Sequence, residues 1–96
     1  MAESTNLDEI RAELDGIDDQ MLKLFMKRMH LAADVARYKE AHGMPTLRPQ
    51  REKEIIDDIK EKAEPEFSEY AADLFIEIMR LSRKYQDTLR SGGKDF

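Results

Sequence analysis

Residues 7–41 decide the fold, and they read LDEIRAELDGIDDQMLKLFMKRMHLAADVARYKEA. With one interruption, their apolar side chains recur at alternating spacings of three and four, which is typical of a helix with a continuous apolar seam. The members of this seam are Leu7, Ile10, Leu14, Ile17, Met21, Leu24, Leu31, Val35 and Tyr38. The stretch therefore predicts one helix of about 35 residues, roughly 50 Å long.

The interruption of the seam is a charged residue. Between Leu24 and Leu31 the spacing requires an apolar side chain at residue 28, where the sequence has Arg28. A guanidinium in an apolar seam is unfavourable unless an anion neutralises it. Two interpretations stay open: Arg28 binds an anionic ligand, or it forms a structural salt bridge with a second chain.

A chain of 96 residues is too short to cover such a long helix with its own remaining segments. A monomeric globule of this length has a radius of gyration of about 13 Å. An uncovered apolar seam would promote aggregation. We therefore expect an all-α homodimer in which the long helices of two chains intertwine.

Two shorter helices are predicted after the long one. The expected helices span residues 6–42, 49–64 and 67–90, followed by a flexible tail at 91–96, all within one domain, 1–96. Asn6 is a favourable N-cap, Gly43 suits a left-handed C-terminal turn, and Pro49 suits the first turn of the second helix. No sustained strand pattern occurs in the sequence.

The composition narrows the function. Hydrophobic residues make up 41% of the chain and charged residues 39%, with a net charge of −5. This suits a folded helical protein and argues against nucleic acid as a partner. Cysteine is absent, which excludes disulfides and is compatible with a reducing cytoplasm. Without a signal-peptide pattern or an apolar run of about 18 residues, we expect a cytoplasmic protein with no membrane partner.

Three basic residues of the long helix are candidate ligands for an anion. Arg28 and Lys39 are eleven residues apart, so they differ by about 20° in direction and about 16 Å along the axis. Both can therefore hold opposite ends of one small anion. Arg11 lies about 25 Å from Arg28 and reaches the same ligand only from the partner chain of an antiparallel dimer.

The shorter helices offer matching polar groups. Arg51 and Glu52 lie in the first turn of the second helix, and Ser82 and Gln86 are four residues apart on the third. Ser82 can donate to a carboxylate, and Gln86 can donate to an ether or hydroxyl oxygen without carrying a charge. Taken singly, each of these residues is also compatible with an ordinary surface position. The two histidines lack the spacing of metal ligands, so no metal site is expected.

In combination, these residues resemble the all-helical class of chorismate mutase over about residues 6–90. The resembling segments are LDEIRAELDGID with Arg11, MKRMHLAADVARYK with Arg28, Val35 and Lys39, RPQRE with Arg51 and Glu52, and LFIEIMRLSRKYQ with Ser82 and Gln86. Each motif is weak alone. Their order and spacing over three helices make the combined resemblance specific.

The resemblance implies a homodimer with two active sites that rearranges chorismate to prephenate, on the route to phenylalanine and tyrosine, without a cofactor. The implied carboxylate ligands are Arg28, Ser82 and the partner's Arg11. Lys39 and Gln86 would face the ether oxygen, and Glu52 the ring hydroxyl. Arg51 would support the electrostatics of the pocket, and Val35 and Met79 would form its apolar walls.

One departure from the family pattern concerns Arg48. Some members have an aspartate near this position that helps to hold the substrate hydroxyl, whereas this chain reads TLRPQRE. Either Glu52 alone or a backbone group would then take that role, and Arg48 is available to attract a dianion.

Three further possibilities stay open. An isochorismate-pyruvate lyase of the same family shares the arginine and lysine framework but lacks a glutamate matching Glu52, so Glu52 favours the mutase. Some members are activated by the first enzyme of the shikimate pathway. A non-catalytic helical dimerisation module is the alternative from another class, in which Arg28 would pair with a protein carboxylate.

Overall fold

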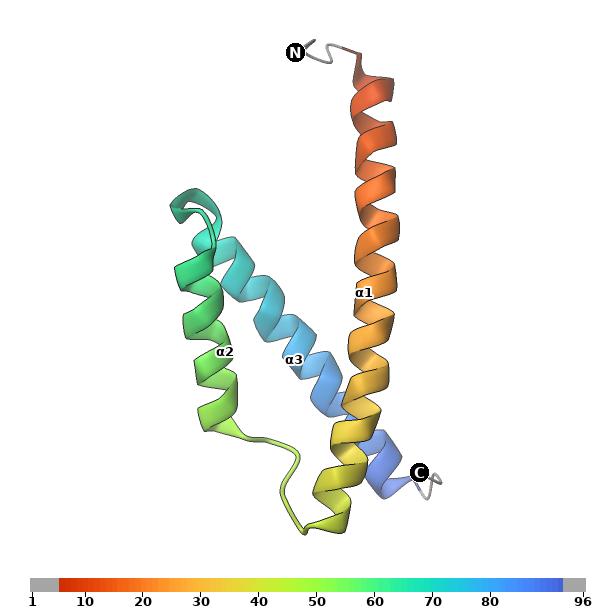
Figure 1. Cartoon of the computed structure of the whole chain (residues 1–96), viewed down its shortest axis with the longest axis vertical. Helices are drawn as coiled ribbons and strands as arrows, with labels where there is room; N and C mark the ends of the chain where they lie inside the picture. The colour runs from red at the N-terminus through yellow and green to blue at the C-terminus, as the bar shows by residue number, and fades with distance from the viewer. Residues whose placement is uncertain (1–5, 93–96) are drawn as a thin grey trace. The chain divides into compact units, whose positions relative to one another are not determined.

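The computed structural model describes residues 6–92. Its elements are α1 (Leu7–Ala41), α2 (Pro49–Lys62), the short 3-10 helix η1 (Pro65–Phe67) and α3 (Ser68–Ser91), as Figure 1 shows. The part of the chain described is thus all-α, with three α-helices, as predicted. The end of the expected tail, at 93–96, lies outside the described residues.

The ends of the first two helices use the residues that the sequence indicated. The backbone N–H of Asp8 donates to Asn6 Oδ1 at 2.7 Å, so Asn6 caps α1. Gly43 has a φ of 64°, and the Met44 amide donates to the Lys39 carbonyl at 2.8 Å, which ends the helix in a left-handed turn. Pro49 opens α2.

The connection between α2 and α3 differs from the expectation. Helix α2 ends at Lys62 rather than at 64, and the 3-10 turn of η1 precedes α3. Glu64 has a ψ of 141° because the ring of Pro65 disfavours helical backbone in the residue before it. Helices α2 and α3 then run back along each other as a hairpin and are in contact (Figure 1).

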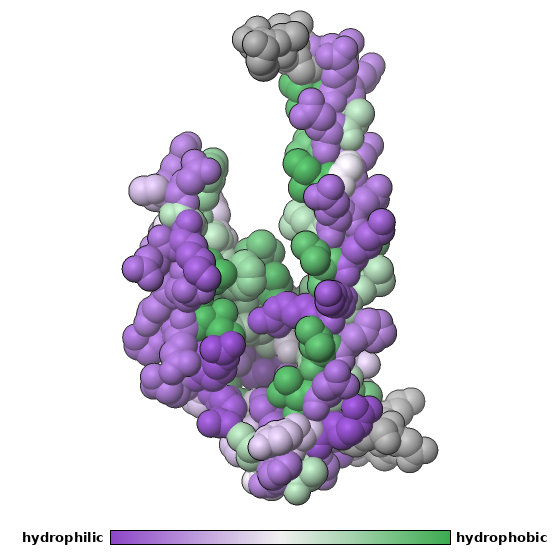
Figure 2. All heavy atoms as spheres, viewed as in Figure 1, coloured by the Kyte–Doolittle hydropathy of each residue, from purple (hydrophilic) through white to green (hydrophobic). Residues whose placement is uncertain are grey.

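The chain divides into two compact units, with the boundary between Leu31 and Ala32 inside α1. The first unit is the N-terminal part of α1, and its seam residues are 41% to 67% exposed. Figure 2 shows green hydrophobic patches along one side of this part of the helix. None of the helices within residues 6–92 is long and apolar enough to cross a membrane.

Among residues 6–92, the buried ones all lie in the second unit, from Ala32 onward. They are Ala32, Ala36, Ala72, Met79, Ser82 and Gln86. Three of these residues are alanines, and small side chains at a helix contact allow a short distance between the helix axes. Ser82 and Gln86 are polar, so the interior of this unit contains a hydrogen-bonding group that the apolar pattern of α3 did not predict.

Candidate active site around Lys39

Lys39 lies in the last turn of α1, where its ammonium joins two other segments of the second unit. Its Nζ atom donates to the backbone carbonyl of Thr46 at 2.6 Å and to Gln86 Oε1 at 3.3 Å. Thr46 belongs to the loop between α1 and α2, and Gln86 belongs to α3. An ammonium has three N–H groups, so one donor of Lys39 is available to a ligand.

Gln86 continues this network into the core. Its Nε2 atom donates to Ser82 Oγ at 3.0 Å, and the two side chains are only 5% and 7% exposed. Burying a polar group is unfavourable unless it is hydrogen bonded, and within residues 6–92 every fully buried side-chain nitrogen and oxygen has a partner. We call Thr46, Lys39, Gln86 and Ser82 the Lys39 network.

The surroundings of Lys39 are positively charged. Burial lowers the pKa of the Lys39 ammonium, and the guanidinium groups of Arg48 and Arg90 lower it further. Glu52 and Asp87 act in the opposite direction, but the pKa stays below its usual value. Such a cluster of cations favours an anionic ligand.

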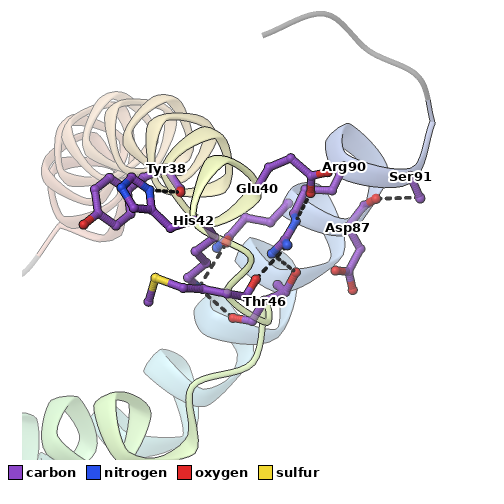
Figure 3. Close-up of polar contacts among 10 residues, drawn as sticks. Tyr38, Glu40, His42, Thr46, Asp87, Arg90 and Ser91 are labelled. Atoms are coloured by element: carbon purple, nitrogen blue, oxygen red, sulfur yellow. Dashed lines mark hydrogen bonds and ion pairs between the residues drawn. The ribbon is translucent and has the colours of Figure 1, made fainter.

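Arg90 holds the loop that carries Thr46. Its Nε atom donates to Glu40 Oε1 at 2.8 Å, Nη1 to Thr46 Oγ1 at 3.1 Å and Nη2 to the Met44 carbonyl at 2.7 Å. Figure 3 shows the guanidinium of Arg90 reaching from α3 to the end of α1 and to the loop. No local pattern selects Arg90 as a site residue, since a basic residue in the last turn of a helix is common.

Glu52, in the first turn of α2, pairs with Arg83 of α3. Arg83 Nη1 donates to both carboxylate oxygens of Glu52 at 2.6 Å. The two side chains are 25% and 30% exposed, so the pair is partly shielded from water. Arg83 is a second residue that the sequence analysis missed. A partly buried glutamate needs a cation as partner. The sequence does not show which of the three basic residues Arg80, Arg83 and Lys84 of α3 pairs with Glu52.

The remaining predicted residues lie in different settings. Met79 is 5% exposed and Val35 is 44% exposed. Arg48 is the N-cap residue of α2 and acts on the pKa of Lys39. Arg51 has a side chain that is 70% exposed and lies 3.7 Å from Glu54, so its expected role stays a prediction.

Two predicted arginines belong to the other unit. Arg11 and Arg28 lie on the part of α1 before Leu31. Their expected roles as carboxylate ligands also stay predictions.

This arrangement defines the chemistry available. The Lys39 network offers an ammonium and a buried amide as donors, within a cationic environment that is partly shielded from water. Donors held in place in this way stabilise negative charge that develops on a ligand oxygen. The described residues thus form an all-α protein, and the Lys39 network is its candidate site for a small anion.

The chain belongs to the chorismate mutase type II family, which it matches over residues 10–87. It is 37% identical to the 4-amino-4-deoxychorismate mutase of Streptomyces venezuelae over 76% of its length, and 48% identical to the chorismate mutase of Methanocaldococcus jannaschii over 56%. It is also 32% identical to the T-protein of Haemophilus influenzae over 77% of its length.

These relatives are longer than the regions they share with this chain. The matched segments span 63%, 54% and 19% of the three relatives, in the order given. No solved structure matches the chain.

Proposed function

We propose that this protein is a chorismate mutase, which converts chorismate to prephenate by a Claisen rearrangement. The Lys39 network is the observation that carries the proposal, because it presents a free N–H of an ammonium beside a buried amide. Membership of the family and 48% identity to a chorismate mutase support it. A rearrangement within one substrate molecule needs no nucleophile, so donors and positive charge are sufficient.

In this proposal the protein acts on conformation and charge. Chorismate is a dianion, and holding it in its folded, reactive conformer removes much of the entropic barrier. Negative charge grows on the ether oxygen as the carbon–oxygen bond breaks. Lys39 donates to that oxygen, and the N–H of Gln86 that does not bond to Ser82 is a second donor.

We also propose a homodimer with shared sites. The exposure of the α1 seam supports it, since Leu14, Ile17 and Leu24 are 51%, 50% and 67% exposed. Arg28 and the partner's Arg11 would then bind the two substrate carboxylates, each as a bidentate guanidinium fork.

Mixing two inactive variants tests the shared site. Arg11→Ala and Lys39→Ala chains, unfolded and refolded together, form heterodimers in half of the cases, and each heterodimer has one intact site. We expect about a quarter of the wild-type activity to return. A stable monomer in solution, or no recovery on mixing, would contradict the shared site.

The activity itself is tested with purified protein and chorismate. Loss of chorismate absorbance, with prephenate identified as the product by NMR, is the expected result. No turnover, either alone or with the first enzyme of the shikimate pathway, would overturn the proposal. Pyruvate release from isochorismate would instead support the lyase alternative.

Other expectations from the sequence stay predictions. These are the cytoplasmic location, activation by the shikimate-pathway enzyme and the independence from a cofactor. The name of the Streptomyces venezuelae relative raises one further question, which is whether the ring substituent of the substrate is a hydroxyl or an amine.

A further inference from the structure

The pair of Glu52 and Arg83 has a geometry that goes beyond an ordinary surface ion pair. One nitrogen, Arg83 Nη1, lies 2.6 Å from each oxygen of the carboxylate. The pair joins the first turn of α2 to α3, with side chains 25% and 30% exposed. Exposed pairs such as Arg80 with Glu77, both 52% exposed, are weakened by water far more.

Glu52 also belongs to the surroundings of Lys39. It is close enough to act on the pKa of Lys39, together with Arg48, Arg90 and Asp87. Within residues 6–92, however, no carboxylate lies within ion-pair distance of Lys39 Nζ, and Glu52 pairs with Arg83 instead. Glu52 is thus paired with Arg83 rather than with the ammonium, which has no carboxylate partner among the described residues.

We propose that Arg83 determines substrate specificity: by neutralising Glu52, it makes the site select a neutral hydroxyl and reject an ammonium on the substrate ring. The inference rests on the proposed function and on the role that the family resemblance implies for Glu52, which is to face the ring hydroxyl of chorismate. Arg83 is a positioning residue here, because it acts through Glu52.

The physical reason is the balance of charge at this side of the site. A carboxylate that already shares its charge with a guanidinium still accepts a hydrogen bond from a hydroxyl, since each oxygen has two lone pairs. It attracts an ammonium only weakly, while Arg83, Arg48 and Lys39 repel it. An aliphatic amine is protonated at pH 7, so 4-amino-4-deoxychorismate brings such an ammonium to the site.

The experiment compares kcat/KM for chorismate and for 4-amino-4-deoxychorismate at pH 7. We expect the wild-type protein to prefer chorismate, and Arg83→Gln to shift the ratio toward the amino substrate by about tenfold or more. Arg83→Lys retains the charge and should retain most of the preference. Arg80→Gln, on the exposed side of the same helix, is the matched control and should leave the ratio unchanged. The ratio is independent of the folded fraction, so partial unfolding of a variant does not affect it.

The outcomes separate this inference from the proposed function. If the wild-type protein converts chorismate and Arg83→Gln has the same ratio as the wild type, Arg83 does not set specificity while the mutase activity stands. A wild-type preference for the amino substrate also overturns the inference. If neither substrate reacts with the wild-type protein, the proposed function fails, and the inference fails with it.

Discussion

Lys39 Nζ donates a hydrogen bond of 2.6 Å to the backbone carbonyl of Thr46. The last turn of α1 is thereby joined to the loop before α2. The same loop is held by Arg90, which bonds to Thr46 Oγ1 and to the Met44 carbonyl. The position of the Lys39 ammonium therefore depends on a residue of α3 that need not touch the substrate.

Replacing Arg90 tests this dependence. Arg90→Ala removes three charge-assisted hydrogen bonds and should lower the free energy of unfolding by about 1–3 kcal/mol. It should also lower kcat, because Thr46, which accepts a hydrogen bond from Lys39, is then less restrained. Arg90→Lys should recover only part of this, since an ammonium lacks the planar fork. Urea denaturation and steady-state kinetics measure the two effects. The control is Arg80→Ala, which replaces an exposed side chain and should change the free energy of unfolding by no more than about 0.5 kcal/mol. Equal losses in both variants would contradict the role of Arg90.

The pH dependence of activity should report Lys39. Its ammonium is the active form, and burial with Arg48 and Arg90 lowers its pKa below the usual 10.5. The ammonium therefore loses its proton at a lower pH than a free lysine does. As the pH rises, kcat/KM should fall with a midpoint below pH 10.5. Bound dianion stabilises the ammonium, so the fall in kcat should come at a higher pH.

Arg48→Gln provides a second check on the same pH profile. Removing this cation should move the alkaline fall in kcat/KM to higher pH, because one cause of the lowered pKa is gone. An alkaline fall at the pH of an ordinary lysine in the wild type, or no movement in the variant, would argue against this assignment.

Ser82 should contribute to stability through Gln86. In Ser82→Ala the buried Nε2 of Gln86 loses its acceptor, and an unsatisfied buried donor costs about 1–3 kcal/mol. Denaturation by urea measures the loss. Ser91→Ala removes a hydroxyl that bonds to the Asp87 carbonyl at the exposed end of α3, and this change should stay within about 0.5 kcal/mol. A Ser82 variant as stable as the Ser91 variant would mean that the Gln86 amide finds another partner.

Gly16 lies inside α1, and Gly43 lies in the turn that ends it. Replacing each with alanine should change the stability of the protein in opposite directions. Gly43 has a φ of 64°, and an added Cβ would meet no neighbouring side chain or backbone within 4 Å. Gly43→Ala should therefore destabilise the fold by about 1–2 kcal/mol through backbone strain, without a steric clash. Gly16 lies inside the helix with equal space for a Cβ, so Gly16→Ala should stabilise it by about 0.5–1 kcal/mol. Thermal unfolding of both variants provides the measurement, and a shared sign would contradict the assigned conformations.

Local patterns predicted the helices well because caps and breakers act over a few residues. Asn6, Gly43 and Pro49 were read correctly for this reason. The 3-10 turn at Pro65 was missed, since proline signals an interruption without specifying what replaces the helix.

The site was predicted only in part, because its remaining contacts are tertiary. Lys39, Ser82 and Gln86 were selected by spacing, and the structure joins them in one network. Arg83 and Arg90 were missed. Their partners are 31 and 50 residues away in the chain, and no local pattern identifies which of several arginines meets a given carboxylate.

The most direct test of the proposed chemistry is the kcat of Lys39→Ala with chorismate, measured beside Lys84→Ala, which removes an exposed lysine of α3. If the Lys39 ammonium stabilises the ether oxygen in the transition state, kcat should fall by about 100-fold to 1,000-fold or more, while Lys84→Ala keeps the wild-type rate. A folded Lys39→Ala variant with unchanged kcat, or with a loss confined to KM, would contradict the role of Lys39 in catalysis.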